Sequence, residues 1–135
     1  MAESAGTHLI VDGYVRDPSV FTAGGIETMF ASVITALEMK ALGAPHIYEV
    51  PVDPEVLRRV KETGTFEDSG GITAIVVIST SHLAVHCWPA ERFFSADVFS
   101  CKDFPHEQAL AIITKCLGVV SSEVTVLKRI KPVLP

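Results

Sequence analysis

The chain has 135 residues, of which 48% are hydrophobic and 20% are charged, and its formal net charge is −5. This length predicts a single domain over residues 1–135 with a substantial core, and the acidic balance without a basic run gives no reason to expect binding to nucleic acid or to an anionic membrane. The N-terminus lacks the positive start and apolar stretch of a signal peptide, and no segment is apolar over the length of a membrane span, so we expect a cytoplasmic protein.

Residues 8–14 and 47–50 have the composition of two β-strands, and a helix is predicted between them. In this helix, over residues 26–37, one stripe of apolar side chains recurs at helical spacing: Ile26, Met29, Phe30, Val33, Ile34 and Leu37. Gly43 is expected to end the helix. A single apolar stripe predicts that the helix covers one face of a sheet.

A short second helix is expected after these elements. Asp53 supplies an N-cap, Pro54 suits the first helical position, and Glu55 places an acid in the first turn. The polar, glycine-rich loop 63–71 follows. It contains Phe66, which is a candidate for substrate contact because loops held by a rigid sheet often bind ligands.

Three successive strands are predicted in the middle of the chain. Residues 72–78 form an apolar run rich in β-branched side chains, which indicates a buried strand. The next strand, residues 82–88, alternates in character, so that one face carries three ring side chains: His82, His86 and Trp88. A turn leads to the third strand, residues 93–99.

The last two of these strands allow a prediction of register. If the turn between them closes an antiparallel hairpin, Trp88 lies beside Phe93. Counting outward then brings Ser81 opposite Ser100 or Cys101. A histidine lies farther along the intervening strand, so a hydroxyl, an imidazole and a thiol are expected within reach of one another.

The chain closes with a helix and a strand. Pro105 and His106 open the helix, and Gly118 fits its end. Its apolar side consists of Ala109, Leu110, Ile113, Cys116 and Leu117. Residues 124–127 are the predicted closing strand, and residues 128–132 a polar exit. This order of elements predicts an α+β fold, a two-layer sandwich of an antiparallel β-sheet with helices packed on one face.

The second face of the sheet also needs a partner. Strands as apolar as residues 72–78 are rarely left wet on either side, so a second sheet is expected there. The simplest source is a twin subunit, and we therefore expect a homodimer.

The stretch VISTSHLAVHCWPAERFFSADVFSC, residues 77–101, resembles the core of the bacterial and archaeal S-adenosylmethionine decarboxylases, small self-processing pyruvoyl enzymes of spermidine biosynthesis. The matching positions are Ser81-His82, His86, Trp88-Pro89, Asp97, Phe99 and Cys101. Near the start, Gly6-Thr7-His8-Leu9 is similar to the opening motif of the family.

The resemblance implies that Ser81 attacks the carbonyl of Thr80. The resulting ester eliminates and leaves a pyruvoyl group, derived from Ser81, at a new N-terminus. Such a group forms a Schiff base with the substrate amine and accepts the electrons of decarboxylation, which no ordinary side chain does.

The resemblance also implies roles for five further side chains. His86 matches the residue that handles protons during self-cleavage, and Thr73 matches a hydroxyl that assists it. Cys101 matches the proton donor in decarboxylation. Trp88 and Phe66 fall near aromatic positions that contact the adenine of S-adenosylmethionine.

The chain departs from the family pattern at two positions. Thr80 stands where the family has Glu, and Ala90 replaces a Glu associated with the substrate ribose. Glu91 comes one residue later, and such a shift on a strand points the side chain the other way. These departures leave two alternatives: the same chemistry on arginine or ornithine, or an uncleaved, non-catalytic paralogue that binds ligand or regulates a partner.

His82, His86 and Cys101 could also be read as metal ligands. No carboxylate pattern accompanies them, and pyruvoyl chemistry accounts for the same residues better, so no metal is expected. The chain has three cysteines without CxxC spacing, which predicts free thiols. Cys87 and Cys116 are interpreted as small core residues.

Overall fold

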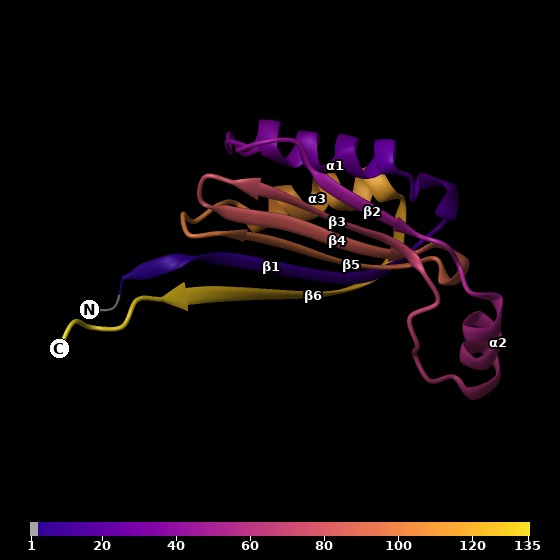
Figure 1. Ribbon diagram of the computed structural model, residues 1–135. Coiled ribbons are helices and arrows are strands. Elements are labelled where there is room, and N and C mark those ends of the chain that lie inside the picture. Colours follow the sequence, from indigo (N-terminus) through magenta and orange to yellow (C-terminus); the bar gives the residue numbers. More distant parts are fainter. Residues whose placement is uncertain (1–2) are drawn as a thin grey trace.

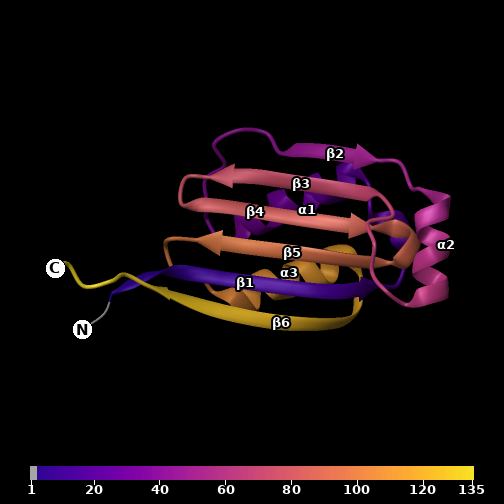
Figure 2. The same cartoon turned by 60° about the horizontal axis from the view of Figure 1, so that its bottom comes forward.

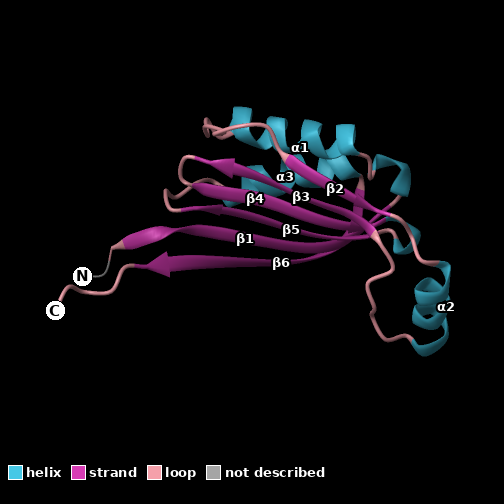
Figure 3. Cartoon of the chain, viewed as in Figure 1, coloured by secondary structure: helices cyan, strands magenta, loops and turns pink. Residues whose placement is uncertain are grey.

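The computed structural model describes residues 3–135 and contains one six-stranded antiparallel sheet (Figures 1 and 3). The strands, in the order β2-β3-β4-β5-β1-β6, are β1 (Ser4–Val15), β2 (His46–Val50), β3 (Gly71–Ile78), β4 (Ser81–Trp88), β5 (Phe93–Ser100) and β6 (Val119–Ile130). Helices α1 (Ala23–Ala36) and α3 (His106–Leu117) lie side by side on one face (Figure 2). The predicted two-layer α+β sandwich is confirmed.

The third helix does not join this layer. Helix α2 (Pro54–Thr63) lies past one end of the sheet, on the side of the face that α1 and α3 leave uncovered (Figures 1 and 2). Asp53 caps it as predicted, since its Oδ1 accepts the backbone N–H of Glu55 at 3.0 Å. None of its residues is buried. Among residues 3–135, no helix is both long and apolar enough to cross a membrane.

The core lies between the sheet and the helices α1 and α3. Burial alternates along β3, β4 and β5, as the period of a strand requires. The largest buried side chains are Phe30, Phe94, Leu9, Ile26, Ile78, Leu83, Ile113 and Leu117. Burial of each such side chain contributes about 1.5–3 kcal/mol, so this face holds the layers together.

Two predicted boundaries are wrong. Helix α1 ends at Ala36 rather than near Gly43, because Glu38 adopts a left-handed conformation (φ 54°) and the chain turns back toward β3. There the N–H of Leu42 donates to the carbonyl of Val77 at 2.9 Å. Residues 128–130, predicted to be a polar exit, are strand residues of β6 because they pair with the beginning of β1.

The register predicted for the central hairpin is confirmed. Trp88 pairs with Phe93, and Ser81 pairs with Ser100. A small 3-10 turn, Pro89–Glu91, joins the two strands. Strand β4 thus carries candidate site residues at both of its ends: Ser81 at its beginning, and His86 and Trp88 near its end.

Candidate active site

At the start of β4, two hydrogen bonds from the end of β5 hold Thr80. The backbone N–H of Cys101 donates to the Thr80 carbonyl oxygen at 2.7 Å. The Ser100 hydroxyl donates to Thr80 Oγ1 at 2.8 Å. A backbone N–H aimed at a carbonyl oxygen stabilises negative charge that develops there during attack on the carbonyl carbon. The carbonyl oxygen before Ser81 thus has a hydrogen-bond donor already in place.

The backbone of Ser81 is unusual. Its φ is 152°, a value that L-residues rarely adopt because the β-carbon crowds the backbone. Residues held in sparsely populated backbone conformations cost about 1–3 kcal/mol each, and they cluster at functional sites. Breaking the peptide bond between Thr80 and Ser81 would release this strain.

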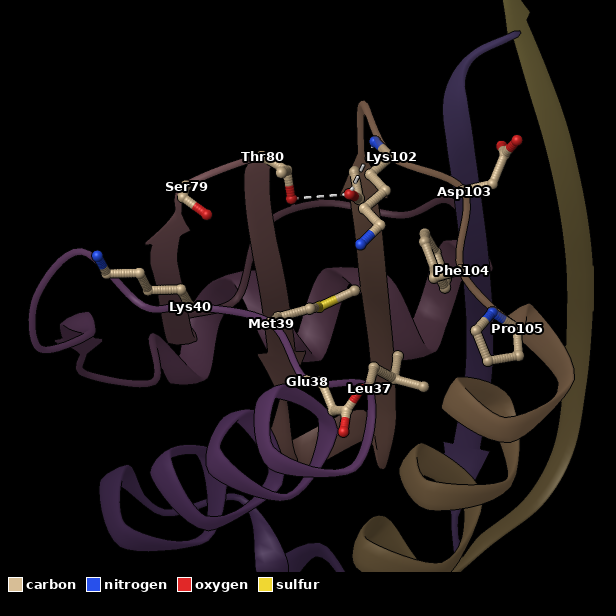
Figure 4. A pocket seen from close by; sticks show the side chains of 11 residues that line it. Leu37, Glu38, Met39, Lys40, Ser79, Thr80, Lys102, Asp103, Phe104 and Pro105 are labelled. Atoms are coloured by element: carbon tan, nitrogen blue, oxygen red, sulfur yellow. Dashed lines mark hydrogen bonds between the residues drawn. The ribbon is translucent and has the colours of Figure 1, made fainter.

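A cavity of about 190 Å³ opens next to Thr80, where the ends of α1 and β5 approach each other (Figure 4). Its lining residues are Leu37, Glu38, Met39, Lys40, Ser79, Thr80, Ser100, Lys102, Asp103, Phe104 and Pro105. Because Thr80 lines this cavity, its side chain lies near two lysines, Lys40 and Lys102, and two carboxylates, Glu38 and Asp103. Position 80 itself carries a hydroxyl instead of a carboxylate.

The histidine of the predicted site lies elsewhere on β4. His86 is five residues beyond Ser81 along the strand, which is about 16 Å at roughly 3.3 Å per residue. The expectation that hydroxyl, imidazole and thiol lie within reach of one another is therefore wrong within one chain. The structure brings Ser81 and Cys101 to one end of the sheet and leaves His86 away from them, since an extended strand cannot bend back on itself.

His86 is instead grouped with Thr73 and Trp88. Thr73 pairs with His86 across β3 and β4, and its Oγ1 is hydrogen bonded to His86 Nδ1 at 3.2 Å. The imidazole stacks on Trp88 with ring centroids 6.3 Å apart. These contacts fix the ring orientation and direct the hydrogen-bonded Nδ1 toward Thr73.

An aromatic pocket of about 460 Å³ lies at the Trp88 end of β4. It is lined by Tyr14, Val60, Gly64, Phe66, Trp88, Glu91, Phe93 and Ser95. Phe66 meets Trp88 edge to face with centroids 5.1 Å apart, and Phe93 stacks on Trp88 at 5.4 Å. Flat aromatic walls of this kind suit a planar ring ligand.

One carboxylate, that of Glu91, lines the aromatic pocket, contrary to the prediction from the sequence. Glu91 was expected to point away because of a one-residue shift along a strand. It belongs to the 3-10 turn, where alternation does not apply, and it lines the pocket, while Ala90 is exposed. The buried Ser69 donates its hydroxyl to Glu91 Oε2 at 3.3 Å.

Tyr14, Phe93 and Ser95 complete the pocket and were not identified from the sequence. The predicted register gave a signal for Phe93, since it pairs with Trp88. Tyr14 reaches the pocket because β1 pairs with β5, opposite Phe93. That neighbour relation joins strands about 80 residues apart in the chain, and no local pattern reveals it.

The three cysteines are free thiols in different surroundings. Burial raises the pKa of Cys87 to about 12, so its thiol stays protonated at neutral pH. Cys101 is exposed beside the Ser81 end of β4, where a thiol can exchange protons with a ligand. In the part of the chain that the structure describes, no three His, Cys, Asp or Glu side chains gather as a metal site.

A family model described as S-adenosylmethionine decarboxylase matches residues 7–130. The S-adenosylmethionine decarboxylase proenzyme of Pseudomonas paraeruginosa is 43% identical over 49 residues, which cover 36% of this chain and 31% of that protein. The proenzyme of Pelotomaculum thermopropionicum is 52% identical over 33 residues, which cover 24% and 26%. The chain thus matches about a third or less of these relatives' own length.

A solved structure extends the likeness along the whole chain. The adenosylmethionine decarboxylase from Aquifex aeolicus superposes with a TM-score of 0.72 and covers 95% of this chain and 92% of its own. The sequence identity is 21%, so this likeness shows the fold.

Proposed function

Because the chain belongs to the S-adenosylmethionine decarboxylase family, we propose that it is a self-processing, pyruvoyl-dependent decarboxylase of S-adenosylmethionine that serves spermidine biosynthesis. In this proposal the chain cleaves itself between Thr80 and Ser81. The observation that carries the proposal is the backbone N–H of Cys101, which lies 2.7 Å from the Thr80 carbonyl oxygen at that bond.

The proposed cleavage uses the groups around this bond in two stages. Ser81 Oγ attacks the Thr80 carbonyl carbon, the C–N bond breaks, and the nitrogen takes a proton, which leaves an ester. The Cys101 N–H stabilises the oxyanion between these events. Loss of the Ser81 α-proton then breaks the bond between Cβ and Oγ, frees the Thr80 carboxylate and leaves an enamine with a double bond between Cα and Cβ. Protonation of Cβ converts this enamine into an imine, and its hydrolysis by water releases ammonia and leaves the pyruvoyl group.

A pyruvoyl group formed from Ser81 would supply the electron sink that decarboxylation requires. The strained φ of Ser81 and the hydrogen bond on the preceding carbonyl fit its formation. Cys101 is the proposed donor of the proton that replaces carbon dioxide on the substrate, since its thiol is exposed at the same end of the sheet.

The proposed roles of His86 and Thr73 require a second subunit, because both lie far from Ser81 in their own chain. We therefore propose a homodimer that packs sheet against sheet. On the uncovered face, Tyr48 is 63% and Val77 is 44% exposed, a degree of apolar exposure that favours burial by a partner. If the strands of the two copies run in opposite directions, His86 of the partner subunit approaches Ser81.

Within one chain, the aromatic pocket lies at the opposite end of β4 from Ser81. In the proposed antiparallel dimer, the pocket of each copy faces the Ser81 end of the other copy, and there it supports S-adenosylmethionine as the substrate. Phe66 and Trp88 offer surfaces for the adenine ring. Glu91 places a carboxylate in the same pocket, where it can accept hydrogen bonds from ribose hydroxyls in place of the Glu that Ala90 replaces. Arginine and ornithine lack a ring for these walls, so they fit the pocket less well.

Denaturing mass spectrometry of the purified protein tests the proposal. We expect two pieces, residues 1–80 and a pyruvoyl-blocked piece ending at residue 135, in place of one 14.5 kDa species. A single intact species would favour the uncleaved paralogue. Carbon dioxide release is then compared among S-adenosylmethionine, arginine and ornithine, and release from arginine or ornithine alone would refute the substrate assignment.

A further inference from the structure

The loop between β5 and α3 carries Cys101 and is fastened to the beginning of β1. The Asp103 carboxylate in this loop accepts hydrogen bonds through Oδ1 from the hydroxyls of Ser4 at 3.0 Å and Thr7 at 2.8 Å. Lys128 of β6 donates to Thr7 Oγ1 at 2.9 Å. We call these four residues, Ser4, Thr7, Asp103 and Lys128, the loop latch.

The direction of the hydrogen bonds in the loop latch is fixed by chemistry. A lysine ammonium only donates, and a carboxylate only accepts. The buried hydroxyl of Thr7 must therefore accept from Lys128 and donate to Asp103. The hydrogen bond from Thr7, followed by that from Ser4, lowers the pKa of Asp103, so the acceptor is charged at neutral pH.

The loop latch adjoins the groups that hold the Thr80 carbonyl. The backbone of Gly6 in β1 lies so close to the end of β5 that a β-carbon there would clash with the Ser100 carbonyl oxygen. Within the loop, the N–H of Lys102 donates to Ser100 Oγ at 3.1 Å. The N–H of Cys101 thus lies between a tight contact with β1 and the anchored Asp103.

On this basis, and resting on the function proposed above, we propose that the loop latch positions the backbone N–H of Cys101 on the Thr80 carbonyl and so speeds self-cleavage. Thr7 and Asp103 are positioning residues. Within residues 3–135, neither side chain is hydrogen bonded to Thr80 or Ser81, and both act through the backbone of residues 101–103. The hydrogen bonds between side chains replace the regular strand pairing that ends at Ser100.

The cleavage rate separates this role from general support of the fold. Thr7→Val keeps the shape of the side chain and removes the hydroxyl, whereas Thr7→Ser keeps the hydroxyl. We expect Thr7→Val and Asp103→Ala to slow cleavage about tenfold, and Thr7→Ser and Asp103→Asn to retain most of the rate. Asp17→Ala is the matched control: it removes another exposed, hydrogen-bonded carboxylate, which accepts the backbone N–H of Ser19 near the opposite end of β1, and it should cleave at the parent rate.

A second measurement decides the proposal independently of cleavage. In the Ser81→Ala background, amide hydrogen exchange of Cys101, followed by NMR, should become about tenfold faster with Asp103→Ala or Thr7→Val and stay unchanged with Asp17→Ala. Unchanged exchange and unchanged cleavage would overturn the loop latch and leave the proposed function intact. If the parent protein does not cleave, the proposed function fails, and the exchange rates alone confirm or refute the positioning of the Cys101 amide.

Discussion

Ser81 combines the proposed nucleophile with a backbone conformation that suits glycine better than serine. Its hydroxyl is the group that the proposed acyl shift needs, and its φ of 152° places strain in its own backbone, next to the bond to be broken. Cleavage would lower this conformational strain energy, because the backbone at the new terminus is free to relax. The proposed cleavage at this residue would therefore be favoured both by the hydroxyl and by the release of backbone strain.

Two substitutions of Ser81 separate these properties. Ser81→Ala and Ser81→Gly should both abolish cleavage and give one 14.5 kDa species, since neither has a hydroxyl. The free energy of unfolding of Ser81→Gly should exceed that of Ser81→Ala by about 1 kcal/mol, because glycine adopts this φ without a steric penalty. Urea titrations followed by circular dichroism give the difference. Cleavage that persists in either variant would show that another residue is the nucleophile, and Ser79→Ala should still cleave.

At the scale of elements, the 3-10 turn between β4 and β5 determines that Glu91, and not Ala90, lines the aromatic pocket. A two-residue hairpin loop would continue the alternation of the strands. The turn Pro89–Glu91 replaces it and ends at Arg92 in a left-handed conformation (φ 55°). The turn thereby exposes Ala90 and places Glu91 on the wall of the pocket, beside Ser69.

Glu91→Gln tests the contribution of this turn to substrate binding. Loss of a charged acceptor for hydroxyl groups costs about 1.5–3 kcal/mol, so KM for S-adenosylmethionine should rise about ten- to a hundredfold. Self-cleavage should proceed at the parent rate, because Glu91 takes no part in the proposed acyl shift. Steady-state assays of carbon dioxide release measure the effect, with Ala90→Ser as the control. An unchanged KM would mean that the carboxylate does not contact the substrate.

Some strand pairings and element ends could be predicted from the sequence, and others could not. The alternation in β4 and β5 and the turn between them were enough to pair Trp88 with Phe93 and to place Ser81 opposite Ser100 or Cys101, and the structure selects Ser100. The position of β1 beside β5 was not, because it depends on packing between segments distant in the chain. The end of α1 and the length of β6 were also missed, since pairing with a neighbouring strand outweighs local composition.

At the scale of the molecule, the two faces of the sheet are unequal. Helices α1 and α3 bury one face, and the other carries His86, Thr73 and Trp88 together with exposed apolar side chains. Two copies related by a twofold axis would cover each other's exposed face with the same patch. With antiparallel strands, each Ser81 end then lies over a His86 end, so that each dimer holds two complete sets of cleavage groups.

Mixing two inactive variants tests this arrangement. Ser81→Ala lacks the proposed nucleophile and His86→Ala lacks the imidazole proposed to handle protons, so neither should cleave alone. In a mixed dimer, the His86→Ala chain keeps Ser81 and faces His86 of the partner subunit, so it should cleave. With equal, randomly assorted chains, about half of the His86→Ala chains should be cleaved, and no Ser81→Ala chain should be. Mass spectrometry of co-expressed chains measures both fractions. As a control, co-expression of His86→Ala with the double variant Ser81→Ala/His86→Ala should give no cleavage. If the original mixture also shows no cleavage, the imidazole does not act across the interface.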